Sequence, residues 1–205
     1  MRDALDCLCR ARVCHRVHSV HANGIPLAAE VRETEFKVLL LDTGLLLAAQ
    51  GLTWQQSWNI ADIMLVNEGA LAEHLVGQML RTAVPHFVDQ ALFYWTRQAR
   101  NAQAEVDYVM ANGTEIVPIE VKAGKSGSLR SLHQFVSEKG SRLAVRVSSE
   151  PPQLAEVKTA VPGQDSRTFQ LLSIPFYLVE ELPRLLASLA PTPARRRTKR
   201  RRTKG

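Results

Sequence analysis

The sequence predicts an α/β fold whose central part runs helix, three strands, helix, strand (αβββαβ). Three patterns predict it: a long amphipathic segment at 62–83, two β-rich runs on either side of Asn112-Gly113, and an amphipathic segment at 128–139 that leads into an apolar run. The chain has 205 residues, of which 45% are hydrophobic and 22% charged. These values are typical of a globular domain with a sizeable core.

The first predicted element of this central part is a helix at 62–83, which ends before a proline. At about 100° per residue, Val76 and Leu80 lie on one half of the helix and His74 lies on the other. Glu73 falls at the rim of the apolar half. Its carboxylate is therefore expected to lie along the edge of the core instead of pointing straight into water.

The next predicted elements are an aromatic strand at 92–95 and a β-hairpin formed by 105–110 and 115–122. With Asn112 and Gly113 as the two turn residues, Asp107 lies opposite Pro118, and Glu105 lies opposite Glu120. Side chains alternate between the two faces of a strand. One face of the hairpin then carries Glu105, Asp107, Glu120 and Lys122, and the other carries an unbroken apolar set, Val106, Tyr108, Met110, Val117, Ile119 and Val121.

Pro118 lies in the middle of the second hairpin strand. Proline cannot donate a hydrogen bond to a neighbouring strand, so its position predicts a bulge or kink close to the charged face.

Beyond the hairpin, the sequence predicts a helix at 128–139, a strand at 142–147, a loop at 148–167, a strand at 169–179 and a closing helix at 180–190. The expected domain organisation is an N-terminal lead or linker at 1–60, a folded domain at 61–190 and a tail at 191–205. Within the lead, the apolar run at 35–49 predicts a buried strand or helix start that continues into a second helical piece. The remainder of the lead is expected to be short and irregular.

The net charge of +6 belongs to the C-terminal tail. The tail has no acid and holds eight basic side chains: Arg195, Arg196, Arg197, Lys199, Arg200, Arg201, Arg202 and Lys204. Removing these eight from the 26 lysines and arginines leaves 18, against 20 acidic residues. Such a run is typical of a disordered arm that grips nucleic acid without sequence preference, and a solvated terminus without a partner is the alternative.

Cysteine and histidine residues are concentrated near the N-terminus, where Cys7, Cys9 and Cys14 precede three histidines. Their spacing lacks the two-residue gap of a zinc knuckle, and an odd count argues against a disulfide framework. Reduced thiols are the favoured interpretation. The first residues are not those of a secretory signal, and no apolar run approaches the roughly 18–20 residues that cross a bilayer, so a cytoplasmic protein without membrane partners is expected.

The charged face of the hairpin is the candidate site. Facing carboxylates repel each other, and a divalent cation between them removes that repulsion, since Mg²⁺ prefers carboxylate oxygens. Lys122, on the same face as Glu120, can hold a water or a phosphate oxygen beside the metal. The alternative is an exposed face on which Lys122 forms a salt bridge with Glu120 or Glu105. Glu105 ranks below the other acids, because it starts its strand.

Three stretches carry a family resemblance: GALAEHLVGQML, LFYWTRQARNAQAEVDYVM and NGTEIVPIEVKAGK. They resemble the C-terminal domain of unknown function of prokaryotic P-loop (AAA-type) ATPases, which is similar to the PD-(D/E)XK restriction-endonuclease-like superfamily. The resemblance spans about Gly24 to Leu186. It implies a restriction-endonuclease-like αβββαβ core and cleavage of DNA with Mg²⁺ or Mn²⁺. The implied roles are metal binding by Asp107 and Glu120, orientation of water by Lys122, support from Glu73, and an accessory role for Gln134.

The chain departs from that family in having no ATPase module. Gly124-Lys125-Ser126 imitates the end of a phosphate loop, but Ile119 occupies the position of the first glycine, so no nucleotide site is expected. The expected partners are DNA, through the site and the tail, and an ATPase on another chain. The alternatives to a nuclease are a non-catalytic binding module that keeps the fold, or a truncated gene product of low stability.

Overall fold

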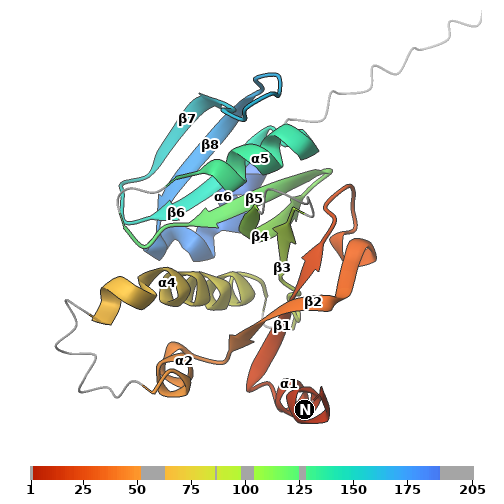
Figure 1. Cartoon of the computed structure of the whole chain (residues 1–205), viewed down its shortest axis with the longest axis vertical. Coiled ribbons are helices and arrows are strands. Elements are labelled where there is room, and N and C mark those ends of the chain that lie inside the picture. Colours follow the sequence, from red (N-terminus) through yellow and green to blue (C-terminus); the bar gives the residue numbers. More distant parts are fainter. Residues whose placement is uncertain (1, 52–62, 86, 98–103, 125–127, 190–205) are drawn as a thin grey trace, which may run out of the picture.

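The structure is a computed structural model that describes residues 2–51, 63–85, 87–97, 104–124 and 128–189, with only the backbone described at 2 and 63–68. It has a mixed α/β fold around an eight-stranded sheet with the order β2-β1-β3-β4-β5-β6-β8-β7 (Figure 1). The predicted fold class is confirmed. No helix among the described residues has the length and apolar character needed to span a membrane.

The central part has the predicted order of elements. It consists of α4 (Ile63–Thr82), β3 (Phe93–Thr96), β4 (Glu105–Asn112), β5 (Glu115–Val121), α5 (Arg130–Lys139) and β6 (Leu143–Ser148). Strands β3, β4 and β5 are antiparallel neighbours, and β6 runs parallel to β5 after the crossover through α5. α5 ends at Gly140, whose φ of 73° is the left-handed conformation that glycine adopts without strain.

Regular structure also fills the N-terminal segment: α1 (Arg2–Arg10), β1 (Cys14–Val20), the short 3-10 helix η1 (Leu27–Glu30), β2 (Val31–Leu40) and α2 (Thr43–Ala49). β1 pairs in parallel with β3 and antiparallel with β2, so both strands belong to the same sheet as the central part. The prediction of an irregular lead was wrong. Polar side chains such as Arg16 and His18 interrupt the hydrophobic pattern of β1 and hide the strand. The strand and helix expected within 35–49 are present as the end of β2 and as α2, but the run is not buried as predicted: Leu39 is buried, whereas Val38 is 42% exposed and α2 has no buried residue.

The C-terminal segment contains β7 (Gln153–Lys158), β8 (Thr168–Pro175), the 3-10 helix η2 (Phe176–Glu181) and α6 (Leu182–Leu189). The loop predicted at 148–167 was wrong, because β7 pairs antiparallel with β8 at the edge of the sheet. Most of its side chains are exposed, so it lacks a buried apolar face that would mark a strand. β8 ends at Pro175, and the chain then turns into η2 instead of continuing to Val179 as an extended strand.

The hairpin forms with a different register. Asn112 pairs with Glu115, and Tyr108 pairs with Ile119, so Gly113 and Thr114 are the two turn residues. Gly113 has a φ of 61°, which is the conformation that a type II′ turn requires at its first central position. Extending this register by one pair places Asp107 beside Glu120, whereas the sequence predicted Pro118 opposite Asp107.

A β-bulge in β4 lies at the candidate site. Phe93 pairs with Val109 and Trp95 pairs with Val106, so Asp107 and Tyr108 together oppose the single residue between Phe93 and Trp95 on β3. The bulge therefore lies between β3 and β4, and not at Pro118, which pairs in register with Val109. An extra residue in one strand redirects the side chains around it, and bulges are frequent next to functional sites.

The bulge also divides the apolar residues of the hairpin, which the sequence predicted to form one unbroken face. Val106 and Val109 pack with Phe135 of α5. Tyr108, Val117, Ile119 and Val121 pack instead with Val76 and Leu80 of α4 and with residues of α6. Helices thus cover both faces of the sheet, α5 on one and α4 with α6 on the other (Figure 1).

Helix α4 is covered on more sides than its hydrophobic pattern indicated. His74, predicted on the polar half, is buried, whereas Leu75 is 39% exposed. The side chain of Gln78 contacts His74 and donates to the carbonyl oxygen of Leu40 at the end of β2. The N-terminal strands and α2 therefore shield a flank of α4 that would otherwise face water.

The contact between α4 and the sheet depends on Gly77. A Cβ atom at this position would lie 2.3 Å from the hydroxyl oxygen of Tyr108 and 2.9 Å from Cδ1 of Leu39. The same hydroxyl donates a hydrogen bond of 2.9 Å to the carbonyl oxygen of Glu73. The buried Tyr108 side chain therefore fixes the turn of α4 that presents Glu73.

We expect Gly77→Ala to lower the free energy of unfolding by about 1–3 kcal/mol, because the buried Tyr108 ring has no room to move away. In a Tyr108→Phe background the nearest contact is removed, so the same substitution should cost clearly less. Urea unfolding of the four proteins measures this difference as a double-mutant cycle. An equal cost in both backgrounds would contradict the proposed role of Tyr108.

Candidate functional site

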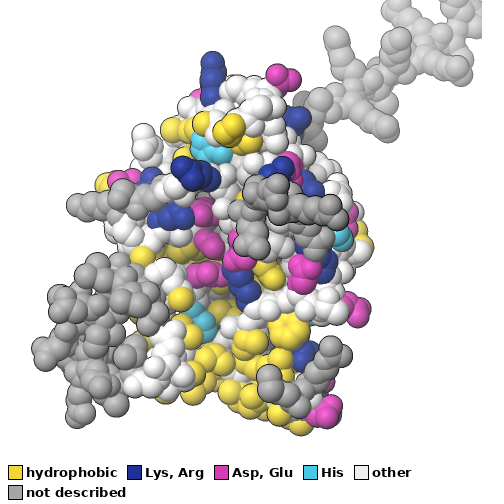
Figure 2. Space-filling model, in the orientation of Figure 1, with side chains coloured by type: hydrophobic (Ala, Val, Ile, Leu, Met, Phe, Trp, Pro, Cys, Tyr) yellow, Lys and Arg dark blue, Asp and Glu magenta, His cyan; other side chains and the backbone are white. Residues whose placement is uncertain are grey.

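The candidate site lies where α4, β2, β4 and the end of β5 meet. β4 contributes Glu105 and Asp107, β5 contributes Glu120 just before its end, and Lys122 follows directly after the strand. α4 contributes Glu73. Figure 2 shows acidic side chains gathered with basic ones near the centre of the face in view.

Asp107 is the one aspartate of this cluster, and its side chain is partly buried. Its Oδ2 accepts a hydrogen bond of 2.7 Å from the backbone N–H of Val121. Burial first, and then the charges of Glu120 and Glu73, raise the pKa of Asp107 to about 7 against the opposing effect of the hydrogen bond and of Lys37. Without added positive charge, this carboxyl group holds its proton up to near neutral pH.

Glu120 is only 5% exposed, and its two oxygens differ. Oε1 lies 2.7 Å from the ammonium of Lys122. This ion pair belongs to the alternative interpretation of the hairpin, but that interpretation also required an exposed face, and Glu120 is buried. Oε2 is buried and has no hydrogen-bond partner among the described residues. Burial raises the pKa of Glu120 by more than the nearby Lys122 lowers it. A buried carboxylate oxygen without a partner is unfavourable, so this site is short of positive charge.

Lys37 of β2 is the residue of this cluster that sequence reasoning missed. Its ammonium lies 2.6 Å from Oε1 of Glu73 and 2.5 Å from Oε1 of Glu105, and 4.8 Å from the centre of the Tyr94 ring. Burial lowers the pKa of Lys37, but the charges of Glu73 and Glu105 outweigh it, so the pKa lies above its usual value. The signal in the sequence was a single lysine at the start of an apolar run.

As the side chains stand, no three Asp, Glu, His or Cys residues of the described ranges lie close enough together to hold a metal ion. The chemistry of the cluster nevertheless fits a divalent cation. The carboxyl groups of the partly buried Asp107 and the buried Glu120 have raised pKa values, and Oε2 of Glu120 has no partner in the described structure. A cation bound by Asp107 and Glu120, with Glu73 in support, would supply the missing charge.

Other predicted residues lie elsewhere or outside the described residues. Gln134 of α5 donates to Glu138 of its own helix at 2.7 Å, and its described contacts do not join it to the acids of the cluster. Lys125, Ser126 and the whole basic tail from Arg195 to Lys204 lie outside the described residues.

The N-terminal thiols form no metal site within the part of the chain that the structure describes. Sγ of Cys9 lies 3.5 Å from Sγ of Cys14, while Cys7 is exposed, and all three thiols are free. Burial, with Cys9 close by, raises the pKa of Cys14 to about 11, so its thiol stays protonated near neutral pH.

Two parts of the chain match known protein families, both without an assigned function. Residues 68–165 match the family described as Domain of unknown function (DUF4143), and residues 1–56 match Domain of unknown function (DUF8612). The first match contains every acid of the candidate site and Lys122, whereas Lys37 lies in the second. No curated protein and no solved structure matches the chain. The comparisons therefore support a domain of unknown function and assign no activity.

The raised pKa of Asp107 predicts how the stability of the metal-free protein depends on pH. Between its usual pKa of 3.8 and about 7, Asp107 keeps its proton in the folded protein and loses it in the unfolded chain. The free energy of unfolding should therefore fall as the pH rises through this window. Asp107→Asn should flatten this fall, because the amide stays neutral and still accepts the hydrogen bond from Val121.

Urea unfolding at several pH values between 4 and 8 measures the slope. The matched control is Asp165→Asn, since Asp165 is exposed and its substitution should leave the slope unchanged. Identical slopes for the wild type and Asp107→Asn would show that Asp107 does not titrate as its burial requires.

Proposed function

We propose that this protein is a metal-dependent nuclease that hydrolyses phosphodiester bonds of DNA, with Mg²⁺ or Mn²⁺ as the cofactor. The observation that carries the proposal is the pair of carboxyl groups formed by the partly buried Asp107 and the buried Glu120, with Lys122 in contact with Glu120 at 2.7 Å. Buried acids with raised pKa values and too little positive charge around them are typical of functional sites.

The order of the elements supports the same proposal. A glutamate on the first helix, an aspartate on a strand, and Glu-x-Lys on the next strand follow one another on an αβββαβ core. This order resembles the PD-(D/E)XK superfamily. The resemblance to the C-terminal domain of prokaryotic P-loop ATPases points to the same fold, and the match of residues 68–165 to a domain of unknown function is compatible with it.

The proposed roles follow from the contacts of each residue. Asp107 and Glu120 would hold the metal ion, and Glu73 would support it from α4. The bound ion would polarise the phosphate and favour ionisation of the attacking water. Lys122 contacts Glu120, and its ammonium would orient a water or a phosphate oxygen and offset developing negative charge. Glu105, which is bound to Lys37, would be an accessory residue.

The basic tail would add affinity for DNA without adding sequence preference, since its eight cations would contact phosphates. This contribution matters because the rest of the chain holds more acidic than basic residues. An ATPase is the second partner that we propose, because the domains that this chain resembles belong to ATPases.

Cleavage of supercoiled plasmid tests the nuclease proposal. The purified protein should nick the DNA with Mg²⁺ or Mn²⁺, and Asp107→Ala and Lys122→Ala should each lower the rate by at least roughly a hundredfold. The matched control for lost positive charge is Lys139→Ala, whose ammonium contacts Asn23 and none of the site residues. Activity that survives both site substitutions would exclude this site as its source.

A second candidate function is a non-catalytic binding module that retains the nuclease-like fold. It is favoured by the ion pairs of Lys37 and Lys122, which already engage Glu73, Glu105 and Glu120. Calorimetric titration with Mg²⁺ separates the two functions. An intact protein that binds no Mg²⁺ would favour the module, whereas binding that Asp107→Ala abolishes would favour the nuclease.

A further inference from the structure

We infer that Lys37 is a built-in counter-cation of the acidic site, which competes with a divalent metal ion for Glu73. The inference rests on the proposed function, because it concerns the metal that the nuclease would bind. It adds a regulatory residue that lies on β2, apart from the helix and the two strands that carry the acids of the site.

The first argument is the position of the ammonium group. It lies between carboxylates of two different elements, 2.6 Å from Glu73 of α4 and 2.5 Å from Glu105 of β4. The side chain of Lys37 is 28% exposed, so water screens these ion pairs only in part. One positive charge neutralises only half of the charge of two carboxylates. A divalent ion in the place of the ammonium would neutralise both.

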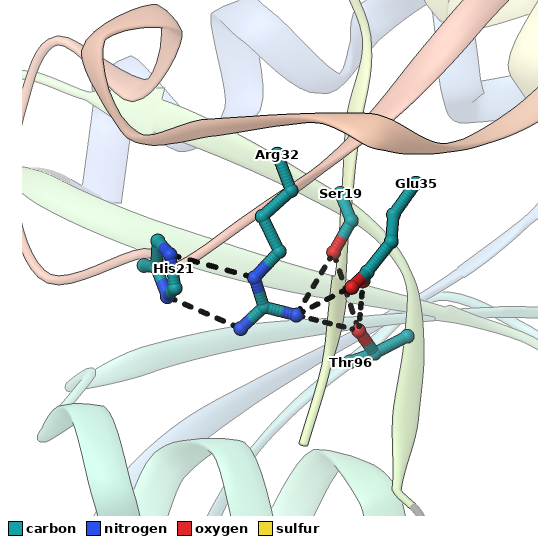
Figure 3. A network of polar contacts seen from close by, with 5 residues as sticks. All are labelled: Ser19, His21, Arg32, Glu35 and Thr96. Carbon is teal, nitrogen blue, oxygen red and sulfur yellow. Dashed lines mark hydrogen bonds and ion pairs between the residues drawn. The ribbon is translucent and has the colours of Figure 1, made fainter. Parts of the chain in front are cut away.

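The second argument is that the strand holding Lys37 is fixed close to the site. In Figure 3 the guanidinium of Arg32 points toward Ser19, Glu35 and Thr96 on one side and toward His21 on the other. Its Nη1 lies 3.1 Å from Oε2 of Glu35 and 3.1 Å from Oγ1 of Thr96. These contacts join β1, β2 and β3, and they end two residues before Lys37.

The same contacts stabilise an irregular stretch of β2. Phe36 pairs with His18 and Arg32 pairs with Ser19, so three residues of β2, 33–35, have no counterpart on β1. This bulge changes the course of β2 immediately before Lys37. The Arg32 network therefore restricts the backbone from which Lys37 reaches Glu73, and the lysine is less free to leave than one on a loose surface strand would be.

The third argument is the competition for one oxygen. Oε1 of Glu73 is engaged by Lys37, and the positive ammonium repels a cation that approaches this oxygen, so metal binding there is opposed for as long as the ammonium stays. Asp107 and Glu120 form no salt bridge with Lys37 and remain as the primary metal ligands. The lysine therefore lowers the affinity for metal without removing the site, and it keeps the acids from repelling one another while no metal is bound.

The experiment measures Mn²⁺ affinity by isothermal titration calorimetry on the full chain. Lys37→Met removes the charge and keeps an aliphatic side chain against the Tyr94 ring, and it should tighten Mn²⁺ binding by roughly tenfold. Lys37→Gln, which keeps a hydrogen-bond donor for Glu73, should tighten it in the same direction. Lys37→Arg keeps the charge and should stay close to the wild type. Thermal unfolding of each variant verifies that it is folded.

Two further variants make the result specific. Lys139→Met removes a lysine that contacts Asn23, and should leave Mn²⁺ affinity unchanged. Glu73→Gln combined with Lys37→Met should lose the gain, because the contested oxygen is then no longer part of a carboxylate.

The outcomes separate this inference from the proposed function. Unchanged or weaker Mn²⁺ binding by the folded Lys37→Met and Lys37→Gln variants would overturn the inference, and so would an absence of binding in every variant. The nuclease proposal is tested separately, by whether the nicking of plasmid DNA depends on Asp107. Tighter binding by Lys37→Met in a protein that never cleaves DNA would support the counter-cation and refute the nuclease.

Discussion

The arrangement of this protein depends on the cost of burying carboxyl groups beside one another. Asp107 and Glu120 lie on the neighbouring strands β4 and β5, where burial reduces the screening of their charges by water. The protein reduces this cost in three ways: a backbone N–H donates to Asp107, Lys122 contacts Glu120, and protons remain bound at higher pH. These measures leave one oxygen of Glu120 without a partner in the described structure. The residual shortage of positive charge is the property from which the proposed metal binding follows.

The N-terminal segment supplies one of the positive charges of the site, and the central segment supplies the acids. Lys37 comes from a segment that matches one family, and the acids come from a segment that matches another. The parallel pairing of β1 with β3 joins the two segments in one sheet. The charge balance of the site is therefore a property of the whole sheet, not of the 68–165 segment alone.

Local patterns in the sequence were sufficient for the αβββαβ order, because α4, α5 and the Asn112-Gly113 hairpin have strong periodic or turn signals. Local patterns were insufficient where contacts between residues distant in sequence determine the strand geometry or the burial of a side chain. The bulge at Asp107 arises from pairing with β3, and the burial of His74 arises from β2 and α2. Glu73, Asp107, Glu120 and Lys122 were predicted as candidates from their order, whereas the position of Lys37 depends on a strand pairing that no local pattern encodes.

The position of the short strand β3 determines what happens to the sheet if the N-terminal segment is removed. It has four residues, it lies between β1 and β4, and it carries Tyr94 and Trp95, which are both buried. If the chain were cut after residue 51 and the first part removed, β3 would become an outer strand with unpaired backbone groups. Such an edge promotes pairing between molecules, so a shortened version made for crystallisation would tend to self-associate. The N-terminal strands thus act as a protective flank for the centre of the sheet.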